Sequence, residues 1–580
     1  MPEQHPIADL SVQDTSPVTA RPAKKPFQME NPQQTADDRR SIEQPRHRKL
    51  GKVVAVDGAY ATLMSYVIDT SEQLYDFWTV GRLITISTID GRVIGLIYKI
   101  NAAEKDWGNK NKIEIHVELV GEIRELTNGE SVFSRGINTY PPLGSVAHQI
   151  RASDLAIIHH PSGRQSVEIG RLSQDESVPA VVCMDDMIKR HFSVVGSTGT
   201  GKSTSVALLV RKIVEARPAL RVLILDPHNE YAKAFPDQCV TISTDTLELP
   251  FWLFQHEEFC EVIFRGRDNF EAEIDVLRDL IPIAKLRYAQ KVNHVHPSLR
   301  RSQEMPAITA DTPVPYRMTD LYALIDEEIG QLESSHNRTV LKSLRNRLEA
   351  LVNDPRYRFM FSQRTVSDNM NSVIGRIFRI PLNERPITAF QLVGLPSDVV
   401  NSVVSVLCRM AFDLAVWSKG ACEVLVLCEE AHRYVPKDKS QGFGPTQRSI
   451  SRIAKEGRKY GSYLGIVTQR PSELDQTILS QCSTIFAMRL ANDRDQAIIR
   501  SAISDSSAST LSFLSSIGNR EAIAFGEGIS TPMRMRFADQ PAKFIPGAPK
   551  EVLPGDEQSQ AIDPDLDAII DSMRNIASRE

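Results

Sequence analysis

The feature that most constrains this chain is a glycine-rich segment with the pattern G-x-x-x-x-G-K-[ST] of a phosphate-binding loop. An apolar run at 192–195 precedes it, and residues 206–214 after it place their apolar side chains on one helix face. A strand, a glycine-rich turn and a helix in this order predict backbone N–H groups that hold nucleotide phosphates. We expect Lys202 to reach the β- and γ-phosphates of ATP and the Ser203 hydroxyl to hold Mg²⁺. The predicted nucleotide-binding residues are Gly196, Ser197, Thr198, Gly199, Thr200, Gly201, Lys202, Ser203 and Thr204.

Length and composition restrict the class of protein. A chain of 580 residues is too long for one hydrophobic core, and its 41% apolar and 24% charged residues are ordinary for a globular protein. A net charge of −5 excludes a generally basic surface, so DNA binding requires a local patch or a pore built from several subunits. The 7 cysteines include no C-x-x-C pair, which indicates reduced thiols. We find no secretion signal and no run of eighteen apolar residues, so we expect a cytoplasmic protein with no membrane partner.

Composition also predicts how the chain is divided. Residues 1–45 are polar and rich in Pro and Gln, which predicts a disordered tail. Short alternating runs with Gly turns predict a small β-barrel at 46–175. Strand–helix alternation predicts an α/β core whose mostly parallel sheet is covered on both faces. We predict this core at 176–268 and 376–540, with a helical insertion between its two parts at 269–375. A C-terminal segment follows at 541–580.

Acidic residues follow a second buried strand, at 424–428, as in a Walker B motif. Glu429 stands where the first acid is usually Asp, and we expect it to orient Mg²⁺ or its water shell. Glu430 would act as the general base that polarises the attacking water. An ordinary acidic turn is the alternative reading of the pair.

Two more strands end in polar residues. Gln469 follows the strand at 464–468, where an amide can contact the γ-phosphate or the attacking water. Asp226, His228 and Glu230 follow the strand at 222–225, a position where open α/β sheets bind ligands. The alternative for Asp226 is a cap on the turn before Pro227.

A basic stretch from Tyr434 to Lys459 has seven basic and two acidic residues in a chain of net negative charge. Because it follows the acidic pair directly, it can couple hydrolysis to a loop that grips phosphates. A solvated basic face is the alternative. The predicted DNA contacts are Lys437, Lys439, Arg448 and Arg452.

Together these segments resemble the HerA family, DNA-translocating ATPases of the HerA/FtsK branch. The resemblance covers about residues 46–545 and rests on GSTGTGKS at 196–203, DPHNEY at 226–231, CEEAHR at 428–433, EGRKYG at 456–461 and TQR at 468–470. It implies a RecA-like core, a ring-shaped homohexamer, arginine fingers at Arg458 and Arg190, and a water-sensing glutamine at Gln469. It also implies that residues 537–549 brace a neighbouring subunit. The long N-terminal tail departs from the family pattern.

The sequence thus predicts an ATP-driven double-stranded DNA translocase or helicase. The resemblance implies a nuclease or other effector as partner, in DNA-end processing or anti-phage defence. Two alternatives stay open at this point: a ring that mainly scaffolds and regulates an effector, and a ring ATPase that remodels proteins.

Overall fold

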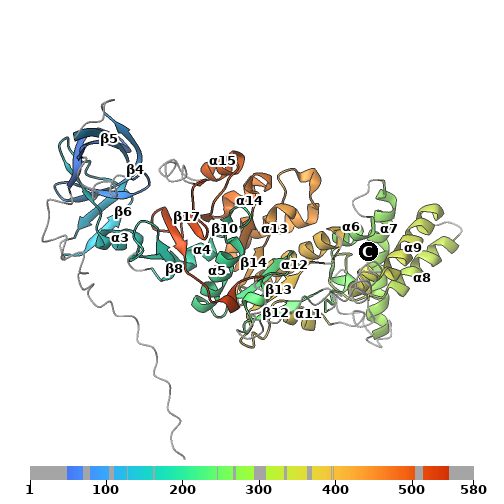
Figure 1. The fold of residues 1–580 in the computed structure, drawn as a ribbon. Helices are drawn as coiled ribbons and strands as arrows, with labels where there is room; N and C mark the ends of the chain where they lie inside the picture. Colours follow the sequence, from blue (N-terminus) through green and yellow to red (C-terminus); the bar gives the residue numbers. More distant parts are fainter. Residues whose placement is uncertain are drawn as a thin grey trace, which may run out of the picture. The chain divides into compact units, whose positions relative to one another are not determined.

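The computed structural model describes residues 49–547, apart from 69–78, 104–109, 127–128, 161–163, 244–245, 265–268, 293–307, 332–335, 362–368, 394, 396 and 503–513 (Figure 1). The predicted tail at 1–45 lies outside the described residues, as does 548–580 of the C-terminal segment.

A small β-barrel begins the described chain, as the alternating pattern predicts. Its strands are β1 (Lys49–Asp57), β2 (Tyr60–Ile68), β3 (Leu83–Ser87), β4 (Gly91–Ala102), β5 (Lys110–Glu125), β6 (Ser131–Ser134) and β7 (Val146–Gln149). They pair in the order β2-β1-β7-β3-β4-β5-β6, and an additional β2–β5 pairing closes the ring. Alternate residues such as Leu63, Ile86 and Val117 point inward and form a core of their own.

The second sheet supports the phosphate-binding loop. Its strands are β8 (Ser166–Leu172), β9 (Pro179–Cys183), β10 (Phe192–Val195), β11 (Arg221–Asp226), β12 (Cys239–Ile242), β13 (Ile387–Gln391), β14 (Val424–Cys428), β15 (Ser462–Thr468), β16 (Thr484–Ala487), β17 (Glu521–Gly526) and β18 (Met533–Phe537). They are ordered β12-β13-β11-β14-β15-β10-β16-β17-β18-β8-β9. Strands that are distant in sequence, such as β10 and β15, are therefore direct neighbours.

The sheet is parallel over only part of its width. The strands from β12 to β16 in this order pair in parallel. The remaining pairings, β16–β17, β17–β18, β18–β8 and β8–β9, are antiparallel. The prediction of a mostly parallel sheet therefore describes the half that includes β10 and β14. Short connections account for two of these antiparallel pairings, β8–β9 and β17–β18, because only antiparallel neighbours can be joined by a tight turn.

Helices cover both faces of this sheet, as predicted. They are α3 (Ala152–His159), α4 (Met184–Lys189), α5 (Lys202–Ala216), α12 (Ser397–Trp417), α13 (Gly444–Glu456), α14 (Gln476–Gln481) and α15 (Asp493–Ser501), whereas α6 (His256–Phe264) packs against α12. Leu223 and Leu225 of β11 belong to one core, whereas Val222 and Ile224 belong to the other. The Val399–Trp417 part of α12 is long and apolar enough to cross a membrane, but 72% of its apolar window is buried inside the protein.

A group of helices lies within residues 269–375. They are α7 (Glu271–Val292), α8 (Met318–Gly330), α9 (Arg338–Asn353), α10 (Arg358–Phe361) and α11 (Met370–Ile377), the last ending just beyond that range. Their apolar faces join the core that also contains α12. The buried Lys285 ties α7 to the following loop, because its Nζ donates to the carbonyl oxygens of Ala310 and Thr312, both at 2.6 Å.

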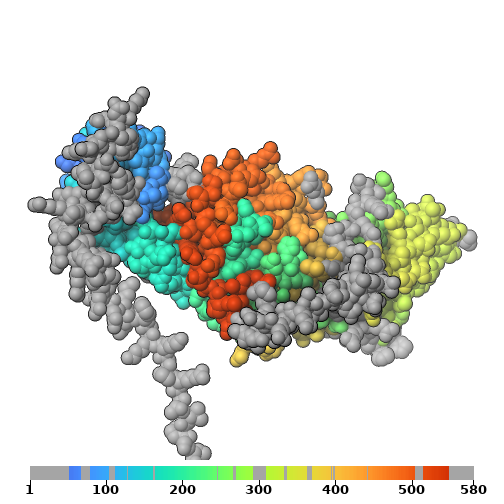
Figure 2. All heavy atoms as spheres, in the orientation of Figure 1, coloured from blue at the N-terminus to red at the C-terminus, as the bar shows by residue number. Residues whose placement is uncertain are grey.

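Residues 538–547, the described part of the chain after β18, lie on the surface and are coloured red in Figure 2. Phe544, in the short helix η12 (Ala542–Phe544), packs its ring 3.6 Å from the guanidinium carbon of Arg211 on α5. The Gly547 N–H donates to the carbonyl oxygen of Glu230. The segment thus contacts its own sheet domain, and its brace of a neighbouring subunit stays a prediction.

Candidate active site

The phosphate-binding loop connects β10 to α5 in the predicted order. Gly199 and Gly201 have φ angles of 78° and 88°, which side-chain-bearing residues adopt at a cost. A Cβ on Gly196 would lie 2.7 Å from the Met488 Cβ, so this glycine also permits a close approach. No side chain caps the N-terminus of α5, and its first N–H groups remain available for phosphate oxygens. The loop therefore fits a nucleotide triphosphate.

The acidic pair lies at the end of β14, opposite the lysine of this loop. Glu429 and Glu430 are only 3% and 5% exposed. The Lys202 Nζ is 4.0 Å from Glu429 Oε1 and 3.6 Å from Glu430 Oε1. The two glutamates therefore share one lysine, so two carboxyl groups face a single positive charge.

Glu430 has an uncommon backbone conformation, with φ 50° and ψ 46°. A non-glycine residue in this region indicates strain of about 1–3 kcal/mol, and such residues concentrate at functional sites. The conformation turns the chain sharply after β14 and keeps both consecutive glutamates at the same strand end.

Glu429 is a buried carboxyl among charged groups of both signs. Burial raises the pKa of the Glu429 carboxyl to about 7, although Lys202 and the Tyr231 hydroxyl lower it; Glu430 and Glu230 raise it further. Among the described residues no group of three or more His, Cys, Asp or Glu side chains could hold a metal alone. This donor set fits Mg²⁺, which binds through one or two protein oxygens together with substrate phosphates. Ser203 and Glu429 remain the predicted ligands.

Gln469 also reaches the phosphate-binding loop. The Thr198 hydroxyl donates to Gln469 Oε1 at 2.5 Å. Because β10 and β15 are adjacent and parallel, their carboxyl ends place Thr198 and Gln469 side by side. The structure thus brings Lys202, Glu429, Glu430 and Gln469 to one edge of the sheet.

Two residues of this edge were not predicted as site residues. The His432 Nδ1 lies 3.0 Å from Thr468 Oγ1 and 3.3 Å from Glu430 Oε2. His432 therefore contacts both the predicted base and Thr468, the last residue of β15. The only sequence signals were the position of Thr468 at a strand end and that of His432 two residues after Glu430.

In the loop after β11, Asp226 has a structural role instead of the predicted ligand-binding one. The Asp226 carboxylate accepts the backbone N–H groups of His228, Glu230 and Tyr231, at 3.2, 3.2 and 2.9 Å. Asp226 therefore caps its own turn, which was the alternative reading. Tyr231, which sequence reasoning did not single out, donates its hydroxyl to Glu429 Oε2 at 2.8 Å.

The two candidate arginine fingers lie at the other edge of the sheet. Arg190 immediately follows α4 and precedes β10, and its guanidinium pairs with Glu527 at 3.3 Å. Arg458 is exposed in the short helix η8 (Gly457–Lys459), just before β15. Lys202 and Gln469 follow the carboxyl ends of the same two parallel strands. Seven residues of β15 span roughly 20 Å, so neither arginine is positioned for the nucleotide of its own chain.

The predicted DNA contacts fall into two groups. Lys437 and Lys439 are exposed in the segment between β14 and α13. Arg448 on α13 pairs with Glu257 of α6. Arg452, also on α13, lies 3.7 Å from Asp413, and its guanidinium covers the Phe412 ring. The two arginines are therefore partly neutralised within the chain.

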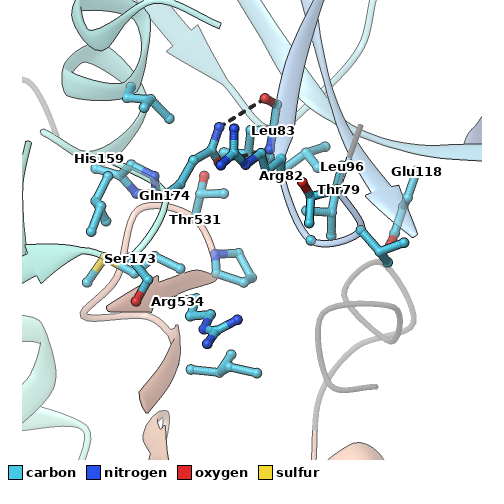
Figure 3. Close-up of a pocket in the computed structure, with 18 of the residues that line it drawn as sticks. Thr79, Arg82, Leu83, Leu96, Glu118, His159, Ser173, Gln174, Thr531 and Arg534 are labelled. Carbon is cyan, nitrogen blue, oxygen red and sulfur yellow. Dashed lines mark hydrogen bonds between the residues drawn. The ribbon is translucent and has the colours of Figure 1, made fainter. Parts of the chain in front are cut away.

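A cavity of about 260 Å³ lies away from this edge, between the barrel and the sheet domain (Figure 3). Its lining includes Arg82 and Glu118 from the barrel and Arg534 from β18. The Gln174 side-chain amide exchanges two hydrogen bonds with the Leu83 backbone at its margin. None of its lining residues belongs to the predicted nucleotide site.

Comparisons with known proteins agree with these motifs. The family model for the central domain of helicase HerA matches residues 167–411. The DNA double-strand break repair helicase HerA of Pyrococcus furiosus is 25% identical over 490 residues, covering 78% of this chain and 82% of that protein. Its counterpart from Saccharolobus solfataricus is 25% identical over 438 residues, covering 72% and 79%. The solved structure of VirB4 from Thermoanaerobacter pseudethanolicus is 13% identical with a TM-score of 0.46, covering 66% of this chain and 98% of that one.

Proposed function

We propose that this chain, which belongs to the HerA family of ATPases, moves double-stranded DNA through a homohexameric ring. The similar proteins that are named DNA double-strand break repair helicases support an action on DNA. The proposal includes a nuclease or another effector as partner, in DNA-end processing or anti-phage defence, and a cytoplasmic location.

The observation that carries the proposal is the division of the site between two edges of one sheet. Lys202, Glu429, Glu430 and Gln469 gather at the carboxyl ends of the parallel strands, and Arg458 precedes the amino end of β15. A complete site therefore requires the arginine of another subunit. Subunits that each complete the next one's site form a ring when the rotation between neighbours closes, and the proposal is that it does.

Each residue of the proposed site has a task that its geometry allows. Lys202 holds the β- and γ-phosphates, and Ser203 and Glu429 are the groups that would hold Mg²⁺. Mg²⁺ neutralises charge on the phosphate oxygens when it is bound. Glu430 accepts the proton of the attacking water, and Gln469 orients that water. Arg458 of the next subunit stabilises the charge on the γ-phosphoryl group, with Arg190 beside it.

The same edge offers a path from the nucleotide to the basic segment. The residues that follow Gln469 pair with the chain before Lys437: the Lys437 N–H donates to the Glu473 carbonyl oxygen at 2.7 Å, and the Asp475 N–H to that of Val435 at 3.0 Å. A displacement of Gln469 on loss of the γ-phosphate would therefore move the segment with Lys437 and Lys439. This movement is the proposed step that pulls DNA.

The test is the rate of ATP hydrolysis with no polymer, with long linear double-stranded DNA, and with an unfolded polypeptide. We expect DNA to stimulate the rate and the polypeptide to leave it unchanged. Stimulation by polypeptide would favour a protein-remodelling ring, and a slow rate that responds to neither would favour a scaffold. Sedimentation with a non-hydrolysable ATP analogue measures the number of subunits in the ring.

A further inference from the structure

We infer that Tyr231 is a positioning residue that holds Glu429 in the orientation required to bind Mg²⁺. The inference deepens the proposed function, because it rests on the assignment of Glu429 to Mg²⁺. It goes beyond that assignment in giving a role to the loop after β11.

The two carboxylate oxygens of Glu429 have different partners. Oε2 accepts the Tyr231 hydroxyl at 2.8 Å, whereas Oε1 faces the Lys202 Nζ at 4.0 Å. One hydrogen bond to Oε2 therefore limits rotation of the carboxylate and leaves Oε1 toward the phosphate-binding loop. Tyr231 is 0% exposed, so water cannot replace its hydroxyl.

The identity of the acid explains why such a restraint is useful. The first acid after this strand is usually Asp, and Glu429 has one more rotatable bond. The added freedom must be lost when the carboxylate binds a cation, which weakens binding unless the side chain is held beforehand. Mg²⁺ tolerates little deviation from octahedral geometry, so orientation matters more than for a larger cation.

The loop that contains Tyr231 is itself fixed at several points. The Asp226 carboxylate accepts three of its backbone N–H groups. The Tyr231 ring belongs to the same buried core as Ala234 and Phe235. The Gly547 N–H holds the carbonyl oxygen of Glu230 at 3.3 Å. The hydroxyl is therefore presented by a rigid loop and not by a mobile side chain.

The test compares two tyrosine-to-phenylalanine substitutions in the segments that follow the neighbouring parallel strands β11 and β14. Tyr231→Phe removes the hydroxyl bonded to Glu429 and keeps the ring. Tyr434→Phe is the matched control, because Tyr434 is equally buried and its hydroxyl has no hydrogen-bond partner among the described residues. The measured quantities are the affinity for a fluorescent ATP analogue in EDTA and the Mg²⁺ concentration that gives half of the Mg²⁺-dependent increase in binding.

We expect Tyr231→Phe to raise that Mg²⁺ concentration by about tenfold, since partners of metal ligands change metal affinity on the order of 10–100-fold. Affinity in EDTA should stay within about twofold, and Tyr434→Phe should match the wild type in both measurements. An unchanged Mg²⁺ requirement in Tyr231→Phe overturns the inference. An equal shift in Tyr434→Phe also overturns it, because the effect would then come from general packing.

A double-substitution cycle keeps the test decisive. The shorter side chain of Glu429→Asp cannot keep the same contact with the Tyr231 hydroxyl, so adding Tyr231→Phe to it should cause no further shift. Additive shifts would overturn the inference. All these binding measurements are made without DNA. If DNA fails to stimulate ATP hydrolysis, the DNA-translocase proposal is wrong, but the role of Tyr231 in Mg²⁺ binding can still be tested.

Discussion

The Nζ of Lys202 lies 3.6 Å from Oε1 of Glu430, although 228 positions separate the two residues in the chain. The contact places the predicted phosphate-binding cation next to the predicted base. Because their roles differ, substitution of each should impair a different step.

Lys202→Ala should weaken ATP binding by about tenfold or more, because the triphosphate loses a charge-assisted hydrogen bond. Glu430→Gln should bind ATP normally but hydrolyse it about 100-fold or more slowly, because an amide cannot accept the proton of the attacking water. Equilibrium binding and single-turnover hydrolysis separate the two effects. Near-normal turnover by Glu430→Gln would rule out its assignment as the base.

The position of Arg458 at the amino edge of the sheet predicts complementation between subunits. Rings of Arg458→Ala alone and of Lys202→Ala alone should each have little ATPase activity. Mixed rings should recover part of it, because one subunit supplies the phosphate-binding loop and its neighbour the arginine. The measurement is ATPase rate against mixing ratio, with assembly checked by sedimentation. Substantial activity in Arg458→Ala rings alone would disprove the assignment.

The predicted DNA contacts should be unequal. Lys437→Ala and Lys439→Ala together should reduce the slope of log affinity against log salt by about 2, because each exposed lysine can release a counterion. Arg448→Ala with Arg452→Ala should reduce it less, since Glu257 and Asp413 already neutralise these arginines in part. Titration of double-stranded DNA at several salt concentrations measures both slopes, with ATPase activity in the absence of DNA as the control. If the two arginine substitutions reduced the slope more than the two lysine substitutions, the DNA would lie nearer α13.

His191 should make stability depend on pH. Its Nδ1 accepts the Leu464 N–H at 3.0 Å, so the neutral ring must donate from Nε2 to the Ala454 carbonyl oxygen at 3.1 Å. Burial lowers the pKa of His191 from 6.5 to about 4. Below pH 6.5 the unfolded chain takes up a proton that the folded chain does not. The free energy of unfolding should therefore fall between pH 6.5 and 4, by up to about 1.4 kcal/mol per pH unit for this residue.

The matched variant for this prediction is His191→Asn. Asparagine tolerates the φ of 60° at this position and can still accept the Leu464 N–H, but it does not titrate. Urea unfolding at fixed protein concentration should show a shallower pH dependence for the variant than for the wild type. Equal slopes would show that His191 is protonated in the folded protein or that other groups dominate.

Local sequence patterns were sufficient to predict the phosphate-binding loop, the strand that precedes Glu429 and the barrel. Each of these depends on residues close together in the chain: glycines before Lys202, an apolar run before two acids, and alternation along single strands. The loop at 196–203 and the acidic pair at 429–430 can therefore be located at strand ends from the order of amino acids alone, and their catalytic roles stay predictions. The position of Gln469 at the same edge followed from one further rule, that parallel strands end together.

Strand order and side-chain partners were decided only by the tertiary structure. The antiparallel strands β17, β18, β8 and β9 join residues about 360 positions apart, and no local pattern specifies that pairing. The bond from Tyr231 to Glu429, the turn capped by Asp226 and the partners of Arg448 and Arg452 likewise depend on which segments pack together. The sequence by itself determined which lysine, acidic and amide side chains follow the strands, because those motifs are formed by neighbouring residues. Only the tertiary structure decided which side chains hydrogen-bond to the site residues and which acids pair with the basic ones, because these contacts form between distant segments that the core brings together.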